Sequence, residues 1–195
     1  MDVIDRLVGI APGSALDAIR ARRPEARTHA EASYQALFAP AEAGEVSATE
    51  RLAAAVFVVG LHGEATTAAF YRDALAATGA APALLAAVDQ AVQAAAGQGP
   101  FGRYPAGPLS VEDSPGPAWQ PDAALRGALG ARLAAAFAHL RLLVLHPRDA
   151  APEHLQALLD AGWSTTGIVT LSQIVSFLAF QVRVVSGFRT LAAAS

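Results

Sequence analysis

The side chains best suited to chemistry in this sequence are gathered in one stretch, ERLAAAVFVVGLHGEATTAAFYRDAL, which begins at Glu50. The stretch starts with a glutamate before an apolar run, which ends in a polar break at His62. A second segment then opens with Glu64 and carries Thr67 and Tyr71. Carboxylates, imidazoles and phenols can transfer protons when a fold places them in one pocket. Acid–base chemistry is therefore a candidate activity.

Other chemistries are excluded by what the sequence lacks. Cysteine is absent, which removes disulfides, thiolate metal ligands and thiol redox chemistry. The five histidines are dispersed, and His139 and His146 have no carboxylate in the same helical register. The sequence also contains no G-x-G-x-x-G, Walker, H-E-x-x-H or G-x-S-x-G motif. We therefore expect neither a metal nor a cofactor.

Charge and hydropathy limit the expected partners. Charged residues make up 16% of the chain and the formal net charge is −3, which provides no basic face for nucleic acid. The one basic cluster, between Arg20 and Arg27, is expected to be a solvated face. The uncharged segment from Trp163 to Phe180 contains several hydroxyl and amide side chains, which favours a buried helix over a membrane span. With no signal-peptide pattern at the N-terminus, we expect a cytoplasmic protein.

Proline, glycine and capping residues predict helices along almost the whole chain. Pro24 and Pro82 suit the first turn of a helix, and Pro40 ends one. Ser47 and Glu50 have the spacing of a capping box. The predicted helices cover residues 2–9, 14–22, 24–39, 47–61, 64–78, 82–96, 122–146, 152–161 and 164–193.

A segment rich in proline and glycine, residues 97–121, separates two helical parts of the chain. Its three aromatic residues predict that it packs across the helices. Arg51-Leu-Ala-Ala-Ala in the first part recurs as Arg132-Leu-Ala-Ala-Ala in the second. We expect one all-α domain made of two related helical halves. Its predicted parts are an N-terminal extension at 1–44, a first half at 45–96, a connector at 97–121 and a second half at 122–195.

The stretch that begins at Glu50 resembles the AhpD-like family, which includes alkylhydroperoxidase D proteins and carboxymuconolactone decarboxylases. In the peroxidase members a glutamate precedes an apolar helix, and C-x-x-C-x-x-x-H starts the next helix. Alignment on Leu75 and Gly79 places the two cysteines at Glu64 and Thr67 and the histidine at Tyr71. Glu50 then matches the upstream glutamate with a two-residue gap.

A second register is open as well. Counting from Glu50 without a gap places the three family positions at His62, Ala65 and Ala69. The C-terminal segment also resembles the closing helices of the peroxidase-related branch, where Gln181 and Arg183 stand near an N/Q-x-x-R-like ending. The resemblance covers residues 45–195.

The resemblance implies an AhpD-like helical fold. It also implies a peroxidase-related or decarboxylase-like function, which the absence of cysteine restricts. A cysteine-dependent peroxidase mechanism is excluded, because neither register retains a cysteine. The decarboxylase branch does not rely on a cysteine pair, so non-thiol acid–base chemistry on a small molecule stays open. The predicted catalytic residues are Glu50, His62, Glu64 and Tyr71, and the predicted substrate-binding residues are Arg183 and Thr67.

Each of these residues also has a structural interpretation. Glu50 completes a capping box, Glu64 suits a helix start, and His62 suits a helix end. Tyr71 suits the edge of a core, and Arg183 suits an ion pair. The alternative function is therefore a catalytically silent helical protein, or a partner of a cysteine-containing homologue. The apolar last helix further predicts a homo-oligomer, and relatives form dimers, trimers or hexamers.

Overall fold

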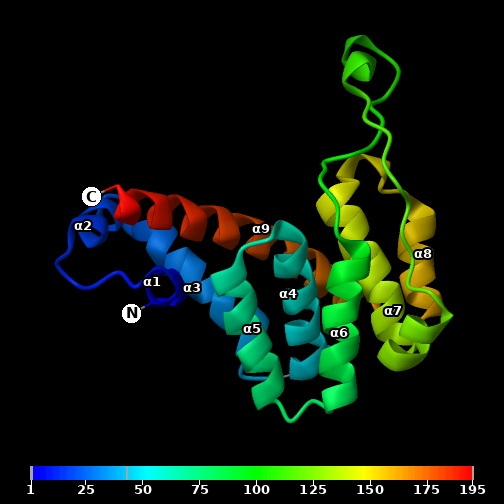
Figure 1. The fold of residues 1–195 in the computed structure, drawn as a ribbon, viewed down its shortest axis with the longest axis horizontal. Helices are drawn as coiled ribbons and strands as arrows, with labels where there is room; N and C mark the ends of the chain where they lie inside the picture. Colours follow the sequence, from blue (N-terminus) through cyan, green and yellow to red (C-terminus); the bar gives the residue numbers. More distant parts are fainter. Residues whose placement is uncertain (1, 43, 195) are drawn as a thin grey trace.

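A computed structural model describes residues 2–42 and 44–194, and it confirms the all-α class (Figure 1). Met1, Ala43 and Ser195, which fall in the predicted segments 1–44 and 122–195, lie outside the described residues. No β-strand occurs in the part of the chain that is described. The elements are α1 (Val3–Val8), α2 (Ala15–Ala21), α3 (Pro24–Phe38), α4 (Ala48–His62), α5 (Ala65–Ala77), α6 (Pro82–Ala95), the 3-10 turn η1 (Pro108–Glu112), α7 (Ala123–Leu145), the 3-10 turn η2 (Pro147–Asp149), α8 (Pro152–Asp160) and α9 (Thr165–Ala193).

The helix boundaries follow local signals in the sequence. Ser14, Ser47 and Ser164 are N-caps whose hydroxyls accept hydrogen bonds from backbone N–H groups of the first turn. The capping box between Ser47 and Glu50 forms as predicted. Prolines occupy the first turns of α3, α6 and α8, where the missing N–H is not needed.

Helix α4 lies at the centre of the fold and contacts α5, α6, α7 and α9. Every residue from Arg51 to Val59 is buried, as expected for a helix that is apolar on all sides. Figure 1 shows α5 and α6 beside α4, with α1 to α3 toward one end of the molecule and α7 and α8 toward the other. The long helix α9 links these parts, because it packs on α1, α3, α4, α7 and α8.

The helix predicted over residues 122–146 is interrupted at Gly130. This residue has φ 77° and ψ 156°, a backbone conformation that glycine adopts without a steric penalty. The segment after the kink packs on α4, where the rings of Phe57 and Phe137 stack with centroids 4.3 Å apart. Phe57 and Phe137 each follow one of the repeated Arg-Leu-Ala-Ala-Ala segments. The two segments therefore lead to the same contact between α4 and α7.

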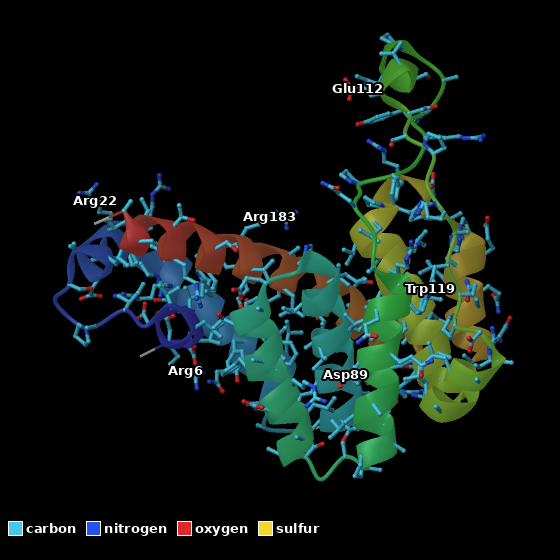
Figure 2. The ribbon with its side chains drawn as sticks, in the orientation of Figure 1. Arg6, Arg22, Asp89, Glu112, Trp119 and Arg183 are labelled. Carbon is cyan, nitrogen blue, oxygen red and sulfur yellow. The ribbon has the colours of Figure 1, made fainter. Side chains whose placement is uncertain are left out.

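Arg141 on α7 links the end of α6, just before the connector, to the last part of the connector. Its Nε donates to the carbonyl of Ala95 and its Nη1 to that of Pro117, each over 3.0 Å. Trp119 (Figure 2) stacks on Phe57 with ring centroids 5.8 Å apart. The two ends of the connector are thus packed across the helices.

The middle of the connector departs from the predicted packing. Gly102 and Ser114 form an antiparallel bridge, and the residues between them project from the helices as an arm that carries η1 (Figure 1). Val111 in this arm is 90% exposed. Only the ends of the connector therefore contribute to the packing on α4 and α7.

The basic cluster near the N-terminus is not fully solvated. Arg20 is buried, and its guanidinium pairs with the carboxylates of Asp2 and Asp5. Arg27 pairs with Asp17 at 2.6 Å. The prediction of a solvated face is therefore wrong for Arg20, because acidic residues at the start of α1 compensate its charge.

Helices α7 and α9 are long and apolar enough to cross a membrane by length and composition alone. Half of the most apolar window of α7 and 56% of that of α9 are buried inside the fold. Core helices of soluble proteins meet the same criterion, so the cytoplasmic location stays a prediction.

Candidate functional site

The tight turn between α4 and α5 brings two of the predicted catalytic residues together. Gly63 ends α4 in the left-handed conformation, with φ 71°, so the chain reverses between His62 and Glu64. Helix α9 passes beside this turn and contributes Arg183. The three residues line one pocket of about 350 Å³, together with Val182 and Ser186.

The imidazole of His62 is held in its neutral form. Burial lowers the pKa of His62 below 6.5, and the positive charge of Arg183 lowers it further. Its Nε2 is buried and has no hydrogen-bond partner among the described residues. The ring also borders a second cavity, of about 510 Å³, which the start of the connector and the end of α7 help to form. His62 therefore places a neutral ring, with Nε2 enclosed and unpaired, where two cavities meet.

The carboxylate of Glu64 caps α5 and is ionised. It accepts hydrogen bonds from the backbone N–H groups of Thr67, at 2.6 Å, and Thr66, at 3.4 Å. Burial raises the pKa of Glu64, but the hydrogen bonds from Thr67 and Thr66 and the charge of Arg189 outweigh it and lower that pKa. The side chain of Thr67 is itself buried. Glu64 thus caps the start of α5 and also faces the pocket.

Tyr71 lies behind the pocket and is fully buried. Its hydroxyl donates to Oε1 of Gln181 on α9 over 2.8 Å, and its ring packs on Phe38 with centroids 4.9 Å apart. Burial raises the pKa of Tyr71 well above 10.0, although the bond to Gln181 opposes this. Tyr71 therefore keeps its proton and fixes α5 against α9.

Glu50 lies at the opposite end of α4. With a rise of about 1.5 Å per residue, the helix separates Glu50 from His62 by roughly 18 Å. Its Oε2 accepts from the N–H of Ser47 at 2.8 Å, and its Oε1 pairs with Nε of Arg132 at 2.6 Å. Burial raises the pKa of Glu50, but the hydrogen bonds from Ser47 and Arg132 outweigh it and lower that pKa. The structure does not bring Glu50 to the pocket.

Arg183 is exposed on α9 (Figure 2), and its Nη1 donates to the carbonyl of Ala179 over 2.6 Å. It forms no ion pair within residues 2–42 and 44–194. A guanidinium without an ion-pair partner at the mouth of a pocket can bind a carboxylate through two parallel hydrogen bonds.

Sequence reasoning missed one residue near the pocket and one at the far end of α4. Arg189 on α9 donates to the hydroxyl of Thr66, which lies 123 residues earlier in the chain. Arg132 pairs with Glu50 from 82 residues away and also places its guanidinium 3.9 Å from the centre of the Trp163 ring. No spacing in the sequence signals either contact, because both arise from helices that meet only in the folded chain.

The structure therefore gathers His62, Glu64 and Arg183 at one pocket, with Thr67 and Tyr71 buried behind it. A neutral base, an ionised acid and a cation with no ion-pair partner can bind an anionic molecule and exchange a proton with it. Among the described residues, no group of three or more His, Asp or Glu side chains could hold a metal ion. No family model, no curated protein and no solved structure matches this chain.

Proposed function

We propose that this chain is an AhpD-like protein, peroxidase-related or carboxymuconolactone decarboxylase-like, that performs non-thiol acid–base chemistry on a small anionic molecule. The observation that carries the proposal is the buried, unpaired Nε2 of a neutral His62 at a pocket shared with Arg183. A general base needs a free lone pair within reach of its substrate, and an anion needs a cation to hold it.

Substrate binding would prepare the base in this mechanism. The charge of Arg183 disfavours a proton on His62, so a substrate carboxylate that pairs with Arg183 weakens this repulsion and raises the pKa of His62. The unprotonated nitrogen of the His62 ring then takes a proton from the carbon beside the substrate carbonyl and returns it to the product. Glu64 and Tyr71 hold the start of α5 in place, and Glu50 positions α4 against α7.

Hydrogen–deuterium exchange tests this proposal. Small keto acids and lactone acids in D2O are followed by proton NMR with the wild type and with His62→Gln, Arg183→Gln and His29→Gln. His29 is the matched control, because it is exposed on α3 and pairs only with exposed Glu25. We expect His62→Gln to slow exchange by about 10²–10⁴-fold. Exchange that is unchanged in His62→Gln contradicts the proposed base.

The same proposal includes a homo-oligomer, for which a groove of about 730 Å³ along α3, α8 and α9 is the supporting observation. Among the residues that the structure describes, no charged one lines the groove, and the lining residues Val169 and Phe180 are 54% and 42% exposed. A second copy of this uncharged surface is a suitable occupant, because neither copy must bury a charge.

Light scattering after size-exclusion chromatography measures the oligomer directly. We expect a dimer, trimer or hexamer for the wild type and a smaller species for Phe180→Glu. A wild-type monomer contradicts the homo-oligomer. A monomer that binds a cysteine-containing homologue, and that exchanges no substrate proton, favours the catalytically silent partner instead.

A further inference from the structure

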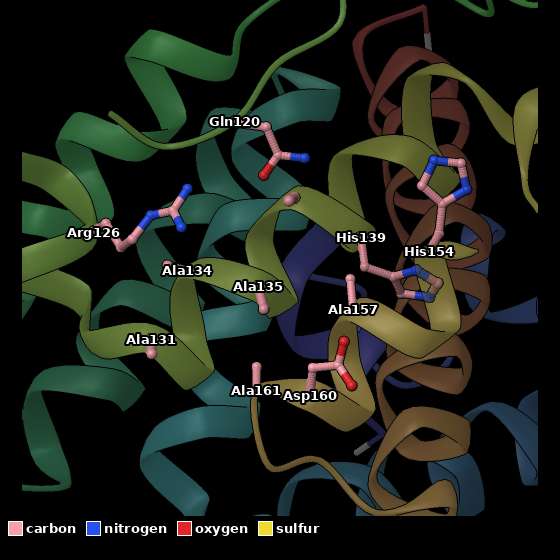
Figure 3. A pocket seen from close by; sticks show the side chains of 11 residues that line it. Gln120, Arg126, Ala131, Ala134, Ala135, His139, His154, Ala157, Asp160 and Ala161 are labelled. Atoms are coloured by element: carbon pink, nitrogen blue, oxygen red, sulfur yellow. The ribbon is translucent and has the colours of Figure 1, made fainter. Parts of the chain in front are cut away.

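A further cavity, separate from both cavities that border His62, lies between α7, α8 and the end of the connector (Figure 3). Its volume is about 320 Å³, at the lower end of the range for small-molecule sites. Small side chains from both helices form most of its wall. They are Ala131, Ala134, Ala135, Ala138, Ala157 and Ala161.

His139 faces this cavity from α7 and lacks the partners that a buried imidazole needs. The residue is 5% exposed, and neither Nδ1 nor Nε2 has a hydrogen-bond partner among the described residues. Buried polar atoms in folded proteins are almost always paired with protein groups or ordered water, so this ring has hydrogen-bonding capacity that the protein itself does not use. Figure 3 shows the ring directed toward the space beside Ala157 on α8.

The other polar residues of the cavity supply mainly hydrogen-bond donors. Nδ1 of His154 accepts from the backbone N–H of Ala151 at 3.1 Å, so the neutral ring carries its proton on Nε2. The guanidinium of Arg126 forms no ion pair or hydrogen bond within the described part of the chain, and Arg126 lines the same cavity as Gln120. The one carboxylate, Asp160, already accepts from Gln156 at 2.8 Å.

We propose that this cavity binds a small organic acid with an apolar body. The carboxylate accepts hydrogen bonds from the imidazoles of His139 and His154, and the apolar body packs on the alanine wall. Arg126 lies toward the other end of the cavity and adds a positive charge that favours an anion. The proposal does not depend on the proposed function, because the two pockets share no lining residue.

Calorimetric titration with benzoate tests the proposal on the full chain, and benzamide serves as the uncharged isostere. Ala157→Phe fills the cavity from α8, and Ala157 is exposed, so the fold tolerates the larger ring. Ala124→Phe is the matched control, an exposed alanine on α7 that does not line the cavity. His139→Leu removes a hydrogen-bond donor, and Arg126→Gln removes the positive charge.

We expect saturable benzoate binding that Ala157→Phe and His139→Leu each weaken by about tenfold or more, the equivalent of one charge-assisted hydrogen bond. Arg126→Gln should weaken it less, because it removes a charge at the other end of the cavity. Ala124→Phe and Arg183→Gln should stay within about twofold of the wild type, and benzamide should bind about tenfold more weakly. Absence of benzoate binding overturns the proposal. Binding that survives Ala157→Phe but is lost in Arg183→Gln overturns it too, since the acid then occupies the pocket at His62.

Discussion

The pockets at His62 and His139 share a design but differ in what surrounds the imidazole. Each has a neutral histidine with a buried, unpaired nitrogen and an arginine without an ion-pair partner among the described residues. At His62 the neighbours are charged, with Glu64 and Arg183 on the same wall. At His139 most residues of the cavity are alanines, and its titratable residues are His154, Arg126 and Asp160.

This difference separates a site for proton transfer from a site for binding. Burial lowers the pKa of both histidines, but Arg183 adds a charge at His62 that a ligand can neutralise. The base strength of His62 therefore changes when an anion binds. Burial is the main reason that His139 stays neutral, so its nitrogens act mainly as hydrogen-bonding groups.

The largest expected effect comes from breaking the contact that joins the two regions. Phe137 stacks on Phe57 between α4 and α7, and Phe137→Ala should lower the free energy of unfolding by about 3–5 kcal/mol. Both pockets should then lose their ligands together. Urea denaturation followed by circular dichroism measures the loss. The control Val111→Ala, at a 90% exposed position in the arm, should change stability by less than about 0.5 kcal/mol. Equal losses in the two variants would show that α4 and α7 are not joined by this contact.

The second prediction compares the free-energy cost of burying the two imidazoles. His139→Leu should raise the free energy of unfolding of the ligand-free protein by about 1–3 kcal/mol, because it removes two unpaired buried nitrogens. His62→Leu should give a smaller gain, because only Nε2 of that ring is buried without a partner. Thermal denaturation of both variants makes the comparison. If His139→Leu is less stable than the wild type, the claim that both nitrogens of His139 are buried without a partner is wrong.

A third prediction uses the direction of the two pKa shifts. Folding lowers the pKa of His62 and His139, so the unfolded chain binds more protons between each folded pKa and the unfolded value near 6.5. Stability should therefore fall as the pH drops below 6.5, by at most about 1.4 kcal/mol per pH unit for each histidine. The melting temperature across this range measures the slope. His62→Gln and His139→Leu should each reduce it, and a slope unchanged in both variants contradicts the shifts.

Much of the fold could be predicted because its signals are local. The serine N-caps, the first-turn prolines and the capping box at Ser47 depend only on neighbouring residues, and they placed the helices correctly. The kink at Gly130 was missed, since a glycine inside a helical pattern does not show which φ it will adopt. The burial of Arg20 was missed because its partners Asp2 and Asp5 lie at least fifteen residues earlier in the chain.

The candidate site was only partly visible in the sequence for the same reason. His62 and Glu64 flank one glycine, so their proximity follows from a turn of the chain. The bond between Tyr71 and Gln181 spans 110 residues and depends on how α5 meets α9. The cavity at His139 depends on alanines of α8, which look in sequence like any helix-forming residue. Pockets between helices are therefore settled by packing, which spacing along one helix does not reveal.

The smallest expected effect comes from Glu50, the predicted catalytic residue that lies outside both pockets. Glu50→Gln keeps the side-chain shape but weakens the pair with Arg132, which is one-third exposed and therefore screened by solvent. We expect a loss of about 0.5–1 kcal/mol at pH 7 that shrinks as acid protonates the wild-type carboxylate, because folding lowers the pKa of Glu50. Proton exchange at His62 should stay within about twofold of the wild type, since roughly 18 Å of helix separates the two residues. An exchange rate that falls as far as in His62→Gln would contradict this expectation. Glu50 would then be a catalytic residue, as the sequence predicts.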